Sequence, residues 1–423
     1  METPDSGLGG SLPNRRWWWR GWAHFGGFSR LFDGPARWGG TWKISGRAGM
    51  RRVSVGVVGL GVIAQTQHLP NLALLDSLFR VAAVADLSPR LTAAIADRLP
   101  GPVFTSTDWR EVCRHPDVEA VLLLTPGAHQ RMAGEALCEG KHVFSEKPLS
   151  LTVAGAERLA SVAQKTQRVL QVGYMKIHEQ VFGDLLRGLE RIGEQRLIRH
   201  SVYHPSHHSQ LSHAEILRFD DGDQEVLDAA ESYERQRAVE AIGDLPHPWE
   251  RIYRKFLVGS LIHTVSVLRT AFAELPRITF AEVWPLDSGP PRSDPPSLFA
   301  RGEFSNHVRV EMSWLWLPSY PAYREVLEVY GTEGSVELLF PQPYLRRRTA
   351  ELTVRHRHEP ARRRGGTESA FIRELRAFHQ TITTGALPRD AMDAAADVAW
   401  LQGMLAALAL RARLAPDGEA GRL

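Results

Sequence analysis

The sequence contains few cysteines and no long apolar run. Only two of its 423 residues are cysteine, Cys113 and Cys138, and they form neither a disulfide framework nor a CxxC pair. No stretch approaches about 18 uninterrupted apolar residues, the length that a membrane-spanning helix needs. We therefore expect a cytoplasmic protein that holds its thiols reduced and has no membrane partner.

The folded part of the chain also lacks an excess of positive charge. The net charge is +3, but residues 1–52 hold nine lysines and arginines against three acidic residues, so the remainder carries a net charge of −3. A protein that binds nucleic acid concentrates basic side chains on its folded surface. We therefore expect no nucleic-acid partner. Hydrophobic residues make up 43% of the chain, which is ordinary for globular domains.

Residues 1–49 show neither a helical nor a strand period. They are rich in tryptophan, glycine and arginine, and Met50 precedes the first regular strand pattern. Three interpretations stay open. Met50 is the natural start and the preceding residues are non-native, or they are a genuine disordered or partner-binding extension. The third is a twin-arginine export signal at Arg15 and Arg16, although charged residues interrupt the apolar run that it requires.

From residue 52 to 173 short apolar runs alternate with helical patterns. Such alternation predicts a parallel sheet with helices on both faces. The expected strands are 53–58, 80–85, 120–124, 142–144 and 169–172, with helices between them, one of which is opened by Ser88 and Pro89.

A glycine fingerprint follows the first expected strand and opens a helix. Gly59 permits a tight turn, Gly61 lets the backbone approach a pyrophosphate, and Ala64 is small enough for close helix packing. Val62 and Ile63 lie at the start of the helix, where free N–H groups favour an anion. This GxGxxA pattern, in its strand–turn–helix context, predicts dinucleotide binding.

Asp86 ends the second expected strand, 22 residues after Ala64. A carboxylate there is placed to meet the adenosine ribose diol and would repel a 2′-phosphate. NAD is therefore favoured over NADP, although Arg90 lies close enough to weaken the preference.

Several motifs together resemble one family. They are TPGAH at 125–129, GKHVFSEKPL at 140–149, VGYMK at 172–176 and VYGTEGSV at 329–336, in addition to the glycine fingerprint. With them the chain resembles the glucose–fructose oxidoreductase/inositol dehydrogenase (Gfo/Idh/MocA) family from about residue 52 to 411. The resemblance implies a Rossmann domain followed by an α/β domain with an open, mostly antiparallel sheet that commonly mediates oligomerisation, here a homodimer or homotetramer.

The resemblance also implies the catalytic residues. The lysine of the family's EKP motif corresponds to Lys147, which can hydrogen-bond a carbinol oxygen and stabilise developing charge. Many relatives carry an aspartate four residues before a histidine. His263 corresponds to that histidine, but Gly259 occupies the aspartate position, so the proton route differs.

The remaining site residues follow from their positions after strands. For the cofactor we expect Thr125, Pro126, His129 and Glu146, with Lys147 beside the nicotinamide. His129 could equally serve only loop packing. Tyr174 and Lys176 start the second domain, where contact with the substrate and a structural role are both open.

Two features of the second half have no counterpart in the family pattern. Histidines 204, 207, 208 and 213 cluster after an expected strand, but without metal-ligand spacing, so no metal site is predicted. Residues 214–255 look like a helical insertion placed to roof the cleft. Trp249 and Tyr253 could then stack on a sugar-like ring or pack inside the insertion.

The sequence thus predicts residues 50–173 as the NAD(P)-binding domain, 174–415 as the substrate and oligomerisation domain, and 416–423 as a frayed tail. The expected activity is hydride transfer between nicotinamide and a secondary alcohol or ketone of a sugar, sugar derivative or cyclitol. The alternatives are a lyase or glycoside hydrolase with transient oxidation and no net redox change, or a non-catalytic nucleotide-binding scaffold.

Overall fold

The computed structural model describes residues 51–285, 294–385 and 390–422. The hypotheses about residues 1–49 lie outside the described residues. Two sheets organise the described part, one in each half of the chain.

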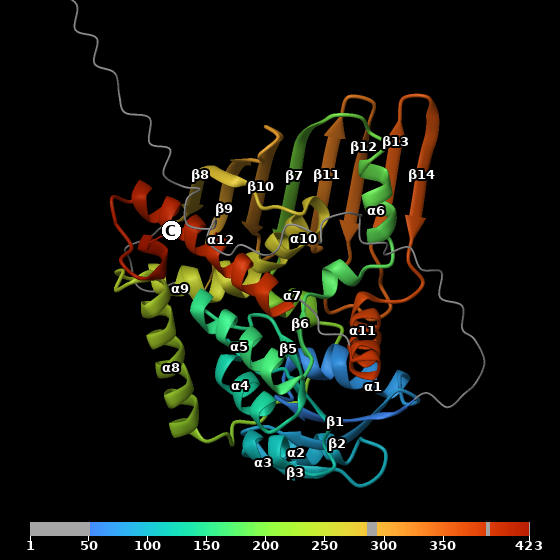
Figure 1. Ribbon diagram of the computed structural model, residues 1–423, viewed down its shortest axis with the longest axis vertical. Coiled ribbons are helices and arrows are strands. Elements are labelled where there is room, and N and C mark those ends of the chain that lie inside the picture. The colour runs from blue at the N-terminus through green and yellow to red at the C-terminus, as the bar shows by residue number, and fades with distance from the viewer. Residues whose placement is uncertain (1–50, 286–293, 386–389, 423) are drawn as a thin grey trace, which may run out of the picture. The chain divides into compact units, whose positions relative to one another are not determined.

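The first sheet is parallel and has the strand order β3-β2-β1-β4-β5-β6 (Figure 1). This is the order of a doubly wound dinucleotide-binding fold, in which ligands bind where the strand order reverses, between β1 and β4. The predicted Rossmann fold is therefore confirmed. Its strands are β1 (Val53–Val58), β2 (Phe79–Ala85), β3 (Phe104–Ser106), β4 (Ala120–Leu123), β5 (His142–Glu146) and β6 (Leu170–Gly173).

Capping side chains define where the helices of this half begin. Ser88 caps the helix that Pro89 opens, because its side chain accepts a hydrogen bond from Leu91 N–H. Thr152 does the same for the helix after β5 by accepting from Gly155 N–H. The helical elements are η1 (Ala64–His68), α1 (Leu69–Leu74), α2 (Pro89–Ala96), α3 (Trp109–Arg114), α4 (Gln130–Cys138) and α5 (Val153–Thr166).

The second sheet has eight strands in the order β14-β13-β12-β11-β7-β10-β9-β8. All pairs of adjacent strands in this sheet are antiparallel except the pair β7 and β10, which is parallel. This confirms the expected open, mostly antiparallel sheet. The strands are β7 (Gln195–His204), β8 (Arg277–Trp284), β9 (Ser297–Glu303), β10 (Arg309–Trp316), β11 (Arg324–Gly331), β12 (Gly334–Phe340), β13 (Glu351–His356) and β14 (Glu359–Gly365).

Helices of the second half link the two sheets. In Figure 1 α8 runs along the flank of the first sheet's helices, and α12 crosses between α5 and the second sheet. α11 packs into the core of the first sheet through Leu375, Phe378 and Ile382. The elements are η2 (Met175–His178), α6 (Phe182–Leu189), α7 (His207–Leu211), α8 (Gln224–Ile242), α9 (Trp249–Arg251), η3 (Ile252–Leu261), α10 (Ile262–Phe272), α11 (Ala370–Thr384) and α12 (Asp390–Arg411).

Among the described helices, α12 alone is long and apolar enough to cross a membrane. However, 56% of its most apolar window is buried inside the protein. It packs against α5 and β8, and Asp397 within it pairs with Arg269 at 2.7 Å. These contacts are typical of a core helix.

The end of the chain differs from the expected frayed tail. Residues Glu419–Arg422 form a short 3-10 helix, η4, in which Ala420 is buried. The Glu419 carboxylate accepts hydrogen bonds from Val153 N–H at 2.8 Å and Ala154 N–H at 3.2 Å, at the start of α5. A negative side chain at a helix N-terminus is favourable, and this contact holds the end in place.

Candidate active site

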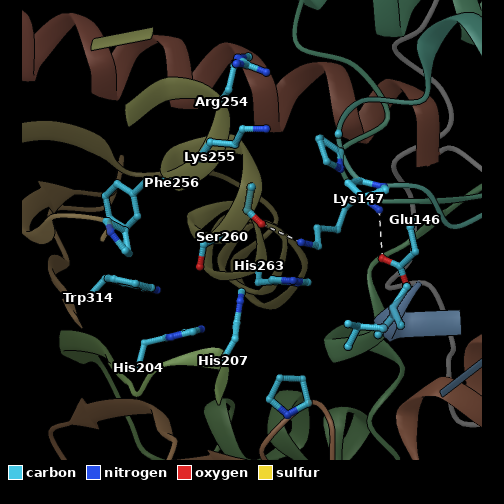
Figure 2. A pocket seen from close by; sticks show the side chains of 18 of the residues that line it. Glu146, Lys147, His204, His207, Arg254, Lys255, Phe256, Ser260, His263 and Trp314 are labelled. Carbon is cyan, nitrogen blue, oxygen red and sulfur yellow. Dashed lines mark hydrogen bonds between the residues drawn. The ribbon is translucent and has the colours of Figure 1, made fainter. Parts of the chain in front are cut away.

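A cavity of about 1160 Å³ opens between the carboxyl edge of the first sheet and the inner face of the second. Figure 2 shows Lys147 and His263 directed toward one space, with His207 beside His263 and with His204 and Trp314 farther from Lys147. Of the predicted site residues, the cavity is lined by Gly61, Val62, Ile63, Thr125, Pro126, Glu146, Lys147, Lys176 and His263.

The glycine turn has the geometry that its sequence predicts. Gly59 has a φ of +88°, and a Cβ there would lie 2.7 Å from the backbone nitrogen of Thr125. A side chain at Gly59 would therefore collide with the neighbouring loop. A Cβ on Gly61, in contrast, would meet nothing within 4 Å, because this glycine faces the open cavity. Ala64 is fully buried beneath the turn.

Asp86 lies at the end of β2 but outside the cavity lining. Its carboxylate accepts a hydrogen bond from Leu60 N–H at 2.8 Å and one from Ser88 N–H at 3.1 Å. It therefore joins the glycine turn to the start of α2. Each carboxylate oxygen has more than one lone pair, so a ribose hydroxyl can still donate to it.

His129 is buried and links two cofactor loops instead of lining the cavity. Its Nδ1 lies 2.8 Å from the Glu146 carbonyl oxygen and its Nε2 lies 2.9 Å from the Thr125 carbonyl oxygen. Burial lowers its pKa. The expectation of direct cofactor contact at this residue gives way to the packing alternative, in which the imidazole fixes the loops after β4 and β5.

Lys147 carries the principal polar contact across the cavity. Its Nζ donates a hydrogen bond to the carbonyl oxygen of Gly259 at 2.7 Å (Figure 2). The backbone of the π-helix η3 thus supplies the acceptor for Lys147 at Gly259, the position where the family resemblance implies an aspartate. Burial lowers the pKa of Lys147 from its ordinary 10.5; Glu146 opposes this and Lys176 adds to it.

His263 lies on the first turn of α10, at the cavity wall near Lys147. Burial, with the charges of Lys147 and Lys176, lowers its pKa well below 6.5. Its imidazole is therefore neutral at physiological pH and can donate or accept a hydrogen bond. The Nδ1 atom is buried without a partner among the described residues.

Glu146 is held from behind by a buried histidine. His68 Nε2 lies 2.9 Å from Glu146 Oε1, and both side chains are almost inaccessible. Burial raises the pKa of Glu146, but the hydrogen bond and the charge of His68 lower it more, so this pKa lies below its usual 4.5. Glu374 of α11 completes the cluster: ligand atoms of the three side chains lie within 4.8 Å of one another.

Glu374 is fully buried, and its carboxylate oxygens have no partner among the described residues. Burial, with the negative charges of Glu146 and Asp390, raises its pKa well above 4.5. In the unfolded chain the Glu374 carboxyl ionises near pH 4.5, while in the folded chain it keeps its proton above that pH. This side chain therefore lowers stability by about 1.4 kcal/mol per pH unit as the pH rises from 4.5 toward the folded pKa.

We expect Glu374→Gln to stabilise the protein at alkaline pH. Glutamine cannot ionise, so the gain over wild type should grow between pH 5.5 and 8, by up to about 3 kcal/mol. Urea unfolding at both pH values measures it, with exposed Glu190→Gln as control. A gain independent of pH would contradict the neutral carboxyl.

Lys176 and Tyr174 have different surroundings: Lys176 lines the cavity, and Tyr174 is buried in the core. Lys176 is buried, lines the cavity and forms a close ion pair with Glu325 of β11, which also lies 3.2 Å from His200. Tyr174 is 2% exposed and packs under the guanidinium of Arg269, 5.9 Å from its ring centre. Of the two roles that the sequence left open for Tyr174, its burial in the core favours the structural one.

An aromatic wall faces Lys147 across the cavity, and the sequence analysis missed it. His204 stacks on Trp314 at 5.0 Å and on Trp316 at 5.6 Å between ring centres, and the two indoles are parallel within 4°. Trp314 and Trp316 are two residues apart on β10 and therefore share a face. Burial lowers the pKa of His204 to about 4, so its ring is uncharged.

The insertion, residues 214–255, lines the cavity with charged side chains, and its predicted stacking residues are buried. Trp249 and Tyr253 are buried, and the Tyr253 hydroxyl donates to the Leu151 carbonyl, so packing decides their role. Glu234 of α8 lines the cavity and accepts Ala128 N–H at 2.5 Å, beside the loop after β4. Arg254 also lines the cavity and holds Glu231, Glu234 and Glu250, which fixes α8 against η3.

The residues present fit a nicotinamide dinucleotide. Open space above Gly61 admits a pyrophosphate to the backbone, and Asp86 lies beside that turn for the ribose. The cavity exceeds the usual 300–1,000 Å³ or so of a single small-ligand pocket. The fold and cavity together define a two-domain protein of the dinucleotide-binding class.

Residues 53–174 match the GFO_IDH_MocA model, described as an oxidoreductase family with an NAD-binding Rossmann fold. Over these residues the chain is similar to the Gfo/Idh/MocA family. The inositol 2-dehydrogenase/D-chiro-inositol 3-dehydrogenase of Shouchella clausii is 34% identical over 151 residues, which are 35% of this chain and 43% of that protein. The chain thus spans less than half of the length of the curated relatives that it matches.

Solved structures resemble the chain over a longer stretch. A levoglucosan dehydrogenase in complex with NADH and levoglucosan has a TM-score of 0.63 at 19% identity and covers 85% of this chain and 98% of its own. A 3-ketoreductase from Actinomadura kijaniata, in complex with NADP and TDP-benzene, has a TM-score of 0.62 at 19% identity, covering 84% and 97%. At this identity the likeness shows the shared fold of both halves.

Proposed function

We propose that the protein is an NAD(P)-dependent oxidoreductase acting on a secondary alcohol or ketone of a polyhydroxylated ring. The observation that carries the proposal is the convergence of Lys147 and His263 on one cavity between the glycine turn and the second sheet. The match of residues 53–174 to a family with an NAD-binding Rossmann fold supports the cofactor. The relatives are named inositol dehydrogenases, which supports an alcohol on a cyclitol or sugar.

The side chains have complementary tasks in this reaction. When bound, the dinucleotide supplies the hydride donor or acceptor. Lys147 polarises the carbinol oxygen and, because its pKa is lowered, can exchange a proton with it. His263 stays neutral and hydrogen-bonds the same oxygen or its neighbour. The Gly259 carbonyl orients the lysine without adding a negative charge to the site.

The substrate side of the cavity suits an uncharged ring. The wall of His204, Trp314 and Trp316 offers flat apolar faces, and Trp316 Nε1 is buried without a partner among the described residues. The charge of Lys176 is balanced by Glu325. Aromatic walls with a few convergent polar groups are typical of sites for small neutral ligands.

The test is a substrate screen that separates net oxidation from cofactor recycling. Purified protein is mixed with NAD or NADP and with myo-inositol, D-chiro-inositol or levoglucosan, and reduced nucleotide is followed at its absorbance band. We expect turnover with at least one cyclitol or sugar, and deuterium transfer from the carbinol carbon. Cleavage or elimination without net nucleotide reduction would favour the lyase or hydrolase alternative, and nucleotide binding without chemistry would favour the scaffold.

Assembly and location form part of the same proposal. The family resemblance suggests a homodimer or homotetramer, and unpaired Cys113 and Cys138 suit the reducing cytoplasm. Native mass spectrometry tests the first point. A monomer at all micromolar concentrations would contradict it.

A further inference from the structure

A segment far from the glycine turn in sequence, residues 217–222, is fixed against the cofactor edge of the first sheet. Leu217 N–H donates to Gln65 Oε1 at 2.9 Å, and Gln65 Nε2 donates to the Leu217 carbonyl at 3.0 Å. Gln65 directly follows the last residue of the glycine fingerprint. Phe219 packs beneath the Arg90 guanidinium, 4.4 Å from the ring centre.

Asp221 of this segment occupies the N-terminus of α2. Its carboxylate accepts a short hydrogen bond from the Ser88 hydroxyl and one from Arg90 N–H at 3.1 Å. The hydrogen bond from Ser88 lowers the pKa of Asp221, so the carboxylate is charged at neutral pH. The first turn of a helix is a natural anion site, and here the chain fills it with its own anion.

This turn is the place where the two dinucleotides differ. Asp86, which ends β2, is bonded to Ser88 N–H and belongs beside the adenosine ribose. A 2′-phosphate on that ribose would project toward the start of α2 and toward a nearby arginine. Asp221 already accepts hydrogen bonds from the Ser88 hydroxyl and the Arg90 N–H at that turn. The guanidinium of Arg90 packs on the Phe219 ring.

We propose that Asp221 is a specificity-determining residue that selects NAD over NADP by taking the place of the 2′-phosphate. The inference rests on the proposed function, since it assumes a dinucleotide at the glycine turn. A 2′-phosphate, with a charge of about −1.5 to −2, would have to displace Asp221 and remain beside Asp86. NAD carries no such group and leaves the contact intact. Asp221 acts together with Phe219, which packs against the guanidinium of Arg90.

The experiment compares dissociation constants of NADH and NADPH for the full-length protein by tryptophan fluorescence at one fixed ionic strength. Asp221→Asn removes the charge and keeps an acceptor, while Asp221→Ala removes both. Asp220→Ala is the matched control, because this exposed neighbour loses the same charge without contact to α2 in the described structure. Thermal melts accompany each titration to confirm folding.

We expect wild type to bind NADH at least about tenfold more tightly than NADPH. Both Asp221 variants should tighten NADPH by about tenfold while NADH changes less than about threefold, and Asp220→Ala should leave the ratio unchanged. An unchanged ratio in folded Asp221 variants, or equal weakening of both nucleotides, would overturn the inference and leave the proposed function standing. Failure of wild type to bind either nucleotide would overturn both.

Discussion

Replacing Lys147 by methionine is expected to lower kcat/KM for the preferred substrate by at least about 100-fold. Methionine has a similar volume and flexibility but cannot donate to the carbinol oxygen or exchange a proton. The wild-type amine bonds the Gly259 carbonyl at 2.7 Å, so it is already oriented before the substrate enters. Steady-state kinetics measures the loss, with exposed Lys165→Met as the control for removal of a lysine charge.

A second variant and a pH–rate profile separate catalysis by Lys147 from a structural role. Lys147→Arg keeps the cation but exchanges no proton near neutral pH, so it should not restore activity. Because burial lowers the lysine pKa, the rate of alcohol oxidation in wild type should rise with pH through that lowered value, below 10.5, as the amine becomes a base. Methionine should abolish this rise. Turnover within a few-fold of wild type would contradict the assigned role.

Gly61→Ala is expected to weaken NADH binding by at least about tenfold while the protein stays folded. The added Cβ would touch no protein atom within 4 Å, since it points into the open cavity. It would stand where the backbone must approach the pyrophosphate. Fluorescence titration measures the affinity, and urea unfolding should show stability within about 1 kcal/mol of wild type.

Two other glycines serve as controls for this substitution. Gly403→Ala in α12 also meets open space and should change neither affinity nor fold. Gly59→Ala should instead destabilise the protein, because its φ is +88° and its Cβ would lie 2.7 Å from Thr125 N. Unchanged NADH affinity in Gly61→Ala would mean that the nucleotide does not cross this turn.

The sequence predicts the first half well because its signals are local. The glycine turn and the cap at Ser88 each depend on a few adjacent residues, and Asp86 follows within one strand–helix–strand unit; all three take the expected structure. β14 was not predicted. Its residues 359–365 are almost all exposed, so this edge strand shows no apolar alternation, and its three arginines indicate only a solvated surface.

The site was harder to predict because its geometry depends on contacts between distant segments. Position after a strand does not fix the direction of a side chain, so the sequence left two roles open for Tyr174, which is buried in the core. Trp314 lies on β10, and only the pairing of β10 with β7 brings His204 onto it. The hydrogen bond that the Ser88 hydroxyl donates to Asp221 spans 133 residues and left no local signal.

The most direct test of the account is nucleotide binding by the purified full-length protein. A portion is denatured to identify any retained nucleotide, and the rest is titrated with NADH and NADPH while tryptophan fluorescence is recorded. The account predicts micromolar or tighter binding of NADH, or its recovery from the denatured sample, with NADPH bound more weakly. A folded protein that binds neither nucleotide would contradict the proposed oxidoreductase.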